Sequence, residues 1–202
     1  MSIKKINPQF AVLMLFIIAA AAIRIFNAEK ILTPIANLTP IGAMAMFGGH
    51  YFKSKWKSYF FPLLTLFISD VVMSQTIYST YSNGLLYQGW YWVYAAFAIM
   101  VLIGKYIKEV SFKNIVIASI AAALAHWVIT DFGVWLAGGI DISTAKPFTK
   151  DIHGFVQCYV LAIPYIKNML IGNLLYGTIL FGGYELLQKK YSFLKPQSYN
   201  II

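Results

Sequence analysis

The chain has 202 residues, of which 59% are hydrophobic and only 11% are charged. This composition, with a mean hydropathy of +0.67, lies far outside the range of soluble globular domains and predicts an integral membrane protein. The net charge of +9 is typical of nucleic-acid-binding proteins, but here the basic residues stand in short connectors, where membrane topology and anionic headgroups explain them. We therefore exclude nucleic acid as a partner. The single cysteine excludes an intrachain disulfide.

Six apolar stretches follow one another along the chain. A helix needs about 20 apolar residues to cross a hydrocarbon core of about 30 Å, so six crossings leave little of the chain for a second domain. We therefore predict an all-α transmembrane bundle of six helices that forms one domain over residues 1–202. The predicted spans lie at 9–26, 38–52, 59–76, 89–108, 112–137 and 165–188.

Lysines mark one side of the predicted membrane. They precede the first span and follow the second, fourth and sixth, whereas segment 77–92 holds no basic residue. By the positive-inside rule both termini lie in the cytoplasm, which predicts a multi-pass membrane protein. Residues 4–22 resemble a cleavable secretory signal, but the apolar run continues to Phe26, so we expect the first span to be retained.

Two of the stretches contain helix signals of their own. At the start of the second, Thr39 suits an N-cap and Pro40 the first helical position, and the small residues that follow favour close packing by a neighbouring helix. The last apolar region would form a helix about 50 Å long, which is too long for one crossing. Pro164 supplies a break, so we predict an interfacial or re-entrant helix at 152–163 before the last span.

Charged side chains inside apolar spans cost about 2.5–3.5 kcal/mol on insertion scales, so each calls for an explanation. In the predicted topology they gather in one layer, roughly 0–12 Å below the outer surface at about 1.5 Å per residue. We predict a pocket there that opens to the outside and binds a small molecule. Its candidate substrate-binding residues are Arg24, Asn37, Thr39, Asp70, Tyr81, Trp127, Asp131, Trp135, Lys167 and Asn173.

The ligand's charge depends on which of these residues face inward. Arg24 and Lys167 balance Asp70 and Asp131 if all four line the pocket, which favours a zwitterionic or neutral, partly aromatic ligand. The tyrosines of the 77–92 connector are expected to close over it. The alternative is that the two aspartates form structural pairs with the two cations and bind no ligand.

Several catalytic motifs are missing. The sequence holds no G-x-x-x-x-G-K-[ST] loop, no H-E-x-x-H and no G-x-S-x-G, so ATP hydrolysis by a P-loop, metalloprotease activity and serine-hydrolase activity have no support. We predict that the chain is not an enzyme and has no catalytic residue, metal site or cofactor. Metal or cobalt ligation by Cys158 stays a remote option, since a buried cysteine is usually inert.

Four segments resemble a bacterial membrane family of unknown function whose members are usually described as candidate transport proteins. That family is similar to the substrate-binding S-components of energy-coupling-factor (ECF) vitamin transporters. The resemblance covers residues 24–182 and implies an S-component-like bundle of six helices, with a ligand pocket near the outer face. It also implies partners, an ECF-type coupling subunit and its ATPases. The segments are NLTPIGAMAMFGGHYF (37–52), the span around Asp70, TDFGVWLAGG (130–139) and GFVQCYVLAIPYIKNMLIGNLLYGTILFG (154–182).

One departure from the family pattern concerns the site. The pattern is expected to have Asn where this chain has Asp131, and Asp where it has Asn173. We predict a transport protein of the bacterial cytoplasmic (inner) membrane, surrounded by membrane lipids, that binds a vitamin-like molecule. Two alternatives stay open: a non-transporting subunit of a larger complex, docked through its Gly/Ala-rich helices, and a membrane-embedded enzyme that uses the acidic layer for proton transfer.

Overall fold

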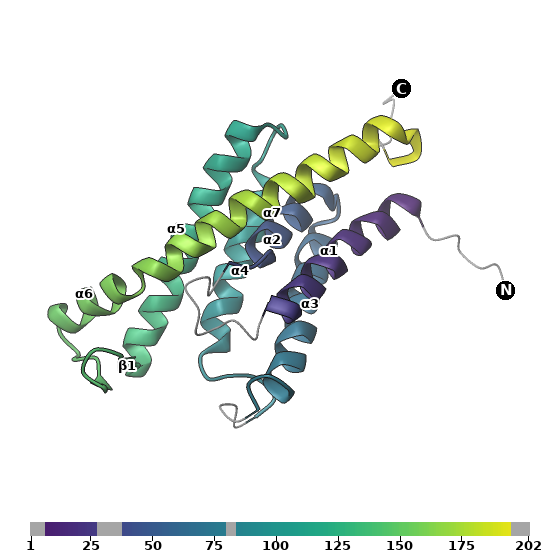
Figure 1. Cartoon of the computed structure of the whole chain (residues 1–202). Helices are drawn as coiled ribbons and strands as arrows, with labels where there is room; N and C mark the ends of the chain where they lie inside the picture. Colours follow the sequence, from purple (N-terminus) through teal and green to yellow (C-terminus); the bar gives the residue numbers. More distant parts are fainter. Residues whose placement is uncertain (1–6, 28–37, 80–83, 195–202) are drawn as a thin grey trace.

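A computed structural model describes residues 7–27, 38–79 and 84–194. Within those ranges the regular secondary structure is helical, apart from two antiparallel strands of two residues each in one connector (Figure 1). The predicted all-α class is therefore confirmed. The helices are α1 (Pro8–Asn27), α2 (Ile41–Tyr51), α3 (Lys55–Gln75), α4 (Trp90–Lys105), α5 (Phe112–Ala137), α6 (Ile152–Leu161) and α7 (Ile163–Lys190), with a short 3₁₀ turn at Ser192–Leu194, and the strands are β1 (Ile140–Asp141) and β2 (Lys146–Pro147).

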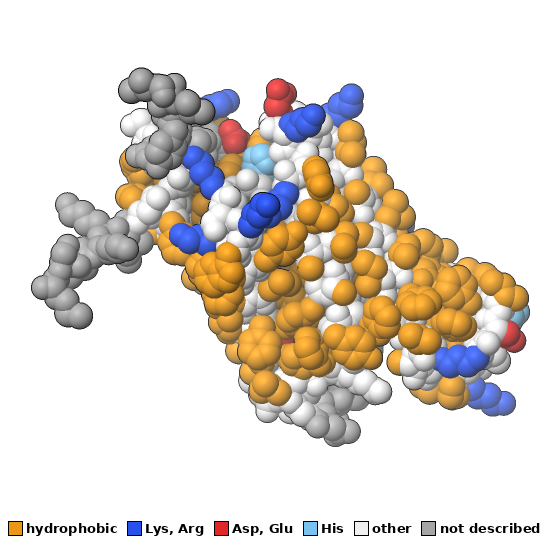
Figure 2. Space-filling view, turned by 180° about the vertical axis from the view of Figure 1, so that it is seen from behind, with side chains coloured by type: hydrophobic (Ala, Val, Ile, Leu, Met, Phe, Trp, Pro, Cys, Tyr) orange, Lys and Arg blue, Asp and Glu red, His pale blue; other side chains and the backbone are white. Residues whose placement is uncertain are grey.

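Four of the helices, α1, α3, α5 and α7, are long and apolar enough to cross a membrane. Helix α4 has 16 residues and α2 has 11, so at about 1.5 Å per residue both fall short of a hydrocarbon core of about 30 Å. The structure thus supports a membrane protein with four candidate spans, and the six crossings stay a prediction. In Figure 2 many Lys and Arg side chains lie at the upper end of the molecule, above a broad apolar surface, and a few lie at the opposite end, at the lower right.

Helix α2 lies at the centre of the bundle, in contact with α1, α3, α4, α5 and α7. All its residues from Ile41 to Gly49 are buried. A Cβ atom on Gly49 would lie 2.1 Å from the carbonyl oxygen of Val101 in α4, and one on Gly104 would lie 2.1 Å from that of Met46. The α2 and α4 backbones therefore meet at a distance that only glycine allows, which confirms the predicted close packing.

The start of α2 differs from the prediction by one residue. Pro40 occupies the N-cap position, Ile41 is the first helical residue, and no side chain caps the helix. Thr39 is therefore not the N-cap. Its backbone instead packs against α7, where a Cβ atom on Gly172 would come within 2.9 Å of the Thr39 carbonyl oxygen. This helix crossing, rather than a capping hydrogen bond, fixes how the chain enters α2.

The predicted break in the last apolar region is present. Helix α6 ends at Leu161 and α7 begins at Ile163, with Pro164 in its first turn. Proline is tolerated there because the first amides of a helix have no intrahelical partner. Helix α7 then crosses the bundle obliquely, and α6, which precedes it, lies beside the C-terminal end of α5 (Figure 1).

The connector between α5 and α6 is fastened to the end of α5. Gly138 ends the helix in the left-handed conformation, with φ of 76°, which glycine adopts without strain. The ammonium group of Lys150 donates to the carbonyl oxygens of Trp135 and Leu136, the last carbonyls of the helix. The indole N–H of Trp135 donates in turn to the carbonyl of Thr149 at 2.9 Å.

Candidate functional site

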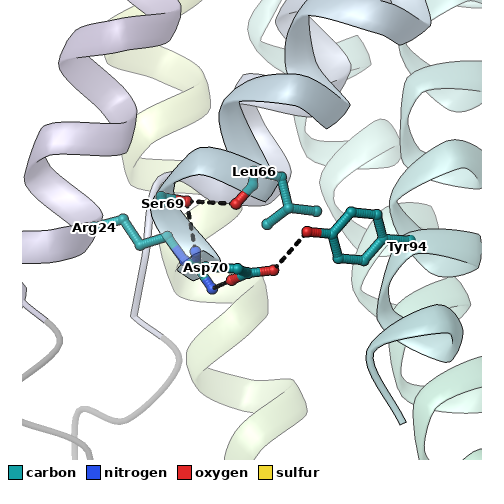
Figure 3. A network of polar contacts seen from close by, with 5 residues as sticks. All are labelled: Arg24, Leu66, Ser69, Asp70 and Tyr94. Atoms are coloured by element: carbon teal, nitrogen blue, oxygen red, sulfur yellow. Dashed lines mark hydrogen bonds and ion pairs between the residues drawn. The ribbon is translucent and has the colours of Figure 1, made fainter. Parts of the chain in front are cut away.

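An ion pair joins α1 to α3 near the C-terminal ends of the two helices. The Nη2 atom of Arg24 lies 2.5 Å from Oδ1 of Asp70, whose side chain is only 1% exposed. Nη1 of Arg24 donates to the Ser69 hydroxyl at 2.6 Å, and the Tyr94 hydroxyl of α4 donates to Oδ2 of Asp70 at 3.0 Å (Figure 3). Oδ2 of this buried carboxylate thus accepts a hydrogen bond, and Oδ1, which accepts none among the described residues, has the Arg24 guanidinium as its counter-charge.

The network of Arg24, Asp70 and Tyr94 ties three helices together. The pairing of Arg24 with Asp70 that the sequence offered as an alternative is therefore present. Tyr87, in the connector before α4, lies near it. Burial raises the pKa of Tyr87, and the negative charge of Asp70 raises it further, while Arg24 lowers it. The connector before α4 therefore passes close to the ion pair at Tyr87.

A separate recess lies between α5 and α7. Its volume is about 240 Å³, and its lining residues are His126, Trp127, Thr130 and Asp131 of α5 with Tyr165 and Ile166 of α7. Asp131 is half-buried, and no Lys, Arg or His of the described residues forms an ion pair with it. The hydroxyl of Thr130 donates to the backbone carbonyl of His126 at 2.8 Å and lies 3.4 Å from its Nδ1. The recess therefore holds a carboxylate without a counter-charge.

Helix α6 packs along α5 beside this recess. The Tyr159 hydroxyl donates to the carbonyl of Val128 at 2.7 Å, and the Cys158 thiol lies 3.5 Å from the backbone carbonyl of Asp131. The ring of Trp127 meets that of Tyr159 edge-on at 5.1 Å. Its indole nitrogen is buried and has no hydrogen-bond acceptor among the described residues. A buried N–H without an acceptor costs stability, so this donor suits an acceptor that arrives with a ligand.

The structure does not bring the ten candidate residues into one pocket. Trp127 and Asp131 line the recess, whereas Arg24 and Asp70 form the separate network. Lys167 is exposed, and within the described ranges it forms no ion pair. The condition for a near-neutral site, that all four charged residues face one pocket, is therefore not met.

The remaining candidates serve the packing or lie elsewhere. Asn173 is fully buried: its Nδ2 lies 3.5 Å from the carbonyl of Ser119 in α5, and a Cβ atom on Gly42 of α2 would lie 2.2 Å from its Oδ1. Trp135 binds the α5–α6 connector, and Thr39 packs on α7. Asn37 and Tyr81 lie outside the described residues.

One protein-family model matches the sequence. The model of a family of unknown function (DUF6580) matches residues 4–197. The chain belongs to this family. The comparisons with curated proteins and with solved structures gave no match.

In this DUF6580 protein the sequence did not identify several residues of the two sites. Ser69, Tyr94, Tyr165 and Ile166 carried no expectation of ligand contact. The nearest signal was the position of Tyr94, whose hydroxyl falls one turn inside α4 and not at its end. Tyr165 and Ile166 follow Pro164 in the first turn of α7, and no local pattern predicts which helix they face.

The described residues contain no group of three or more His, Cys, Asp or Glu side chains that could hold a metal ion. Cys158 is a buried free thiol on α6. Its neighbour in the recess wall is the backbone of Asp131.

Proposed function

We propose that this DUF6580 protein is a membrane transport protein that binds a small molecule in the α5–α7 recess. The observation that carries the proposal is the lining of one recess, where Asp131 has no counter-charge and Trp127 has a buried indole N–H without an acceptor among the described residues. An uncompensated carboxylate inside an apolar helix costs stability. A ligand that supplies its counter-charge would recover that cost on binding.

The two groups specify the chemistry of the ligand. Asp131 accepts hydrogen bonds and favours a positive charge, while Trp127 donates one. The rings of Trp127 and Tyr165 and the Ile166 side chain offer apolar contact around them. The site therefore fits a small, partly aromatic molecule with a cationic or N–H-rich edge and one acceptor atom. This replaces the near-neutral ligand expected from four charges facing one pocket.

The transport part of the proposal is supported by the apolar helices and by the resemblance to S-components. In this proposal the chain crosses the bacterial cytoplasmic membrane six times with both termini inside, and the recess lies in the outer half. The basic end in Figure 2 is consistent with that orientation under the positive-inside rule. An ECF-type coupling subunit with its ATPases would supply the energy, since the sequence has no P-loop.

The test is a thermal-shift screen of the purified full chain against vitamins, nucleobase precursors and tetrapyrroles, with cationic and neutral members in each set. A ligand at about 100 times its Kd stabilises the folded state by about 2.7 kcal/mol. Asp131→Asn should weaken a cationic hit at least about tenfold, equivalent to about 1.4 kcal/mol. Trp127→Phe should weaken it less, because it removes one neutral hydrogen bond.

Glu109→Gln is the matched control, because Glu109 is an exposed carboxylate outside α5, and it should leave the affinity unchanged. A hit that binds Asp131→Asn as tightly as the original protein would show that the recess is not the site. If no compound binds and the protein co-purifies in a fixed complex, the non-transporting subunit is the better interpretation.

A further inference from the structure

A second recess lies at the basic end of the bundle, between the end of α4 and the start of α5. Its volume is about 280 Å³, and its lining includes Ile103, Tyr106, Lys108, Asn114, Ile117 and Ala121. It shares no residue with the α5–α7 recess or with the Arg24–Asp70 network. Any ligand here is therefore independent of the proposed transport site.

The recess is apolar along its length and basic at its rim. Tyr106 is 76% exposed and Ile117 is 54% exposed, so large apolar surfaces border its opening. Lys108 is exposed at the rim, and Lys113 is exposed in the first turn of α5. The only acidic residue of this connector is Glu109.

Two contacts fix the geometry of the rim. The side-chain amide of Asn114 donates to the backbone carbonyl of Glu109 at 2.9 Å, which folds the connector back on α5. Lys105 is turned away toward α3, where its ammonium group lies 4.7 Å from the centre of the Tyr59 ring. Of the nearby lysines, Lys108 lines the groove, and Lys113 directly precedes the lining residue Asn114 on α5.

We propose that this groove, hereafter the α4–α5 groove, binds one phospholipid with an anionic headgroup. An acyl chain would lie against Ile103, Ile117 and Ala121, and the phosphate would meet Lys108 and Lys113. The charge at the rim is complementary to an anionic headgroup and not to a zwitterionic one. The exposed side chains of Leu102 and Ile120 continue the apolar surface along both helices, which fits a chain that runs into the hydrocarbon core.

The groove is held in place from within the bundle. Its wall includes Ile107, whose backbone is hydrogen-bonded to the imidazole of His50 at the end of α2. Helix α2 and α4 are themselves locked backbone to backbone at Gly49 and Gly104. A preformed groove spends little binding energy on ordering its walls, which favours a retained lipid over a transient contact.

The experiment is native mass spectrometry of the full chain in mild detergent, titrated with phosphatidylglycerol or with phosphatidylcholine of the same acyl chains. We expect one phosphatidylglycerol to bind more tightly than phosphatidylcholine. Lys108→Gln should weaken phosphatidylglycerol about fivefold, the effect of about one lysine near a membrane surface. It should leave phosphatidylcholine unchanged.

Lys53→Gln is the matched control, since Lys53 is exposed in another basic connector and does not line the groove. Ala121→Phe fills the groove and should reduce binding of both lipids, with the melting temperature as a check on folding. Equal losses from Lys108→Gln and Lys53→Gln would show general attraction to the basic end and overturn the proposal. Equal affinity for the two lipids, or no retained lipid, would overturn it as well.

Discussion

Asp70 and Asp131 occupy similar places in their helices but have opposite surroundings. Each lies within two turns of the end of a long apolar helix, α3 or α5. Asp70 is almost fully buried, with Arg24 at 2.5 Å and the Tyr94 hydroxyl at 3.0 Å. Asp131 is half-buried in a recess without a cation. The first carboxylate is satisfied by the protein, and the second is left for something else to satisfy.

This difference separates a structural charge from a candidate binding charge. Both residues are charged and lie at a similar depth in an apolar span, so the sequence assigns them to one layer. What distinguishes them is whether another helix brings a cation to the carboxylate, and that depends on helix packing. A buried charge in a membrane protein therefore indicates a ligand site only once its partners are known.

The largest expected effect comes from breaking the satisfied pair. Arg24→Ala leaves Asp70 buried without its counter-charge and should destabilise the fold by about 3–5 kcal/mol. Unfolding in detergent, followed by circular dichroism, would measure this loss. Lys167→Ala, at an exposed cation of α7, is the control and should change stability by less than about 0.5 kcal/mol. Equal effects of the two substitutions would mean that the Arg24–Asp70 pair does not hold the bundle together.

A smaller effect is expected from the hydroxyl on the other side of the same carboxylate. Tyr94→Phe removes one hydrogen bond to a charged group and keeps the ring, so it should cost about 1.5 kcal/mol. The same unfolding measurement applies, with Tyr106→Phe as control because Tyr106 is 76% exposed. If Tyr94→Phe costs nothing, Arg24 alone satisfies Asp70 and the link to α4 has no energetic weight.

The sequence predicted the parts of the fold that depend on local chemistry. Apolar length placed the long helices within a few residues of their observed bounds, and proline chemistry placed the break before α7 within two residues. The close packing of α2 by a neighbouring helix followed from its small residues, whereas the identity of that neighbour, α4, did not. Thr39 was misassigned because a cap was inferred from residue type, whereas packing against Gly172 decides where α2 begins.

The site was less predictable because it depends on how helices are rotated against one another. Asn173 was placed at the pocket by depth, yet it faces Gly42 and Ser119 in the interior. Trp135 shares a stripe with Trp127 and Asp131, but the connector after α5 takes up its indole N–H. The depth of a residue in the membrane can be counted along its own span. The side that its side chain faces depends on helices from distant parts of the chain.

A third carboxylate, outside the membrane-spanning helices, extends the comparison and carries the smallest effect. Asp151 caps α6: its Oδ1 accepts from the backbone N–H of Gly154 at 2.8 Å and from the Thr149 hydroxyl at 2.6 Å. These bonds, that of Gly154 first, lower the pKa of Asp151. Neutral donors thus stabilise this charge at the surface, where Asp70 needs a guanidinium in the interior.

The sign of the resulting pH dependence is fixed. A carboxylate whose pKa is lower in the folded state contributes stability above its unfolded pKa, about 3.9, and loses that contribution as the pH falls through the folded value. The α5–α6 connector should therefore loosen below about pH 4, and hydrogen exchange at the Gly154 amide would report it. Asp151→Asn keeps an N-cap acceptor but cannot titrate, so it should remove most of this pH dependence. Only the part that comes from Asp141 should remain, since the Ser143 hydroxyl lowers the pKa of that residue. A connector that loosened as the pH rose would contradict the capping role, because protonation could not then be what releases α6.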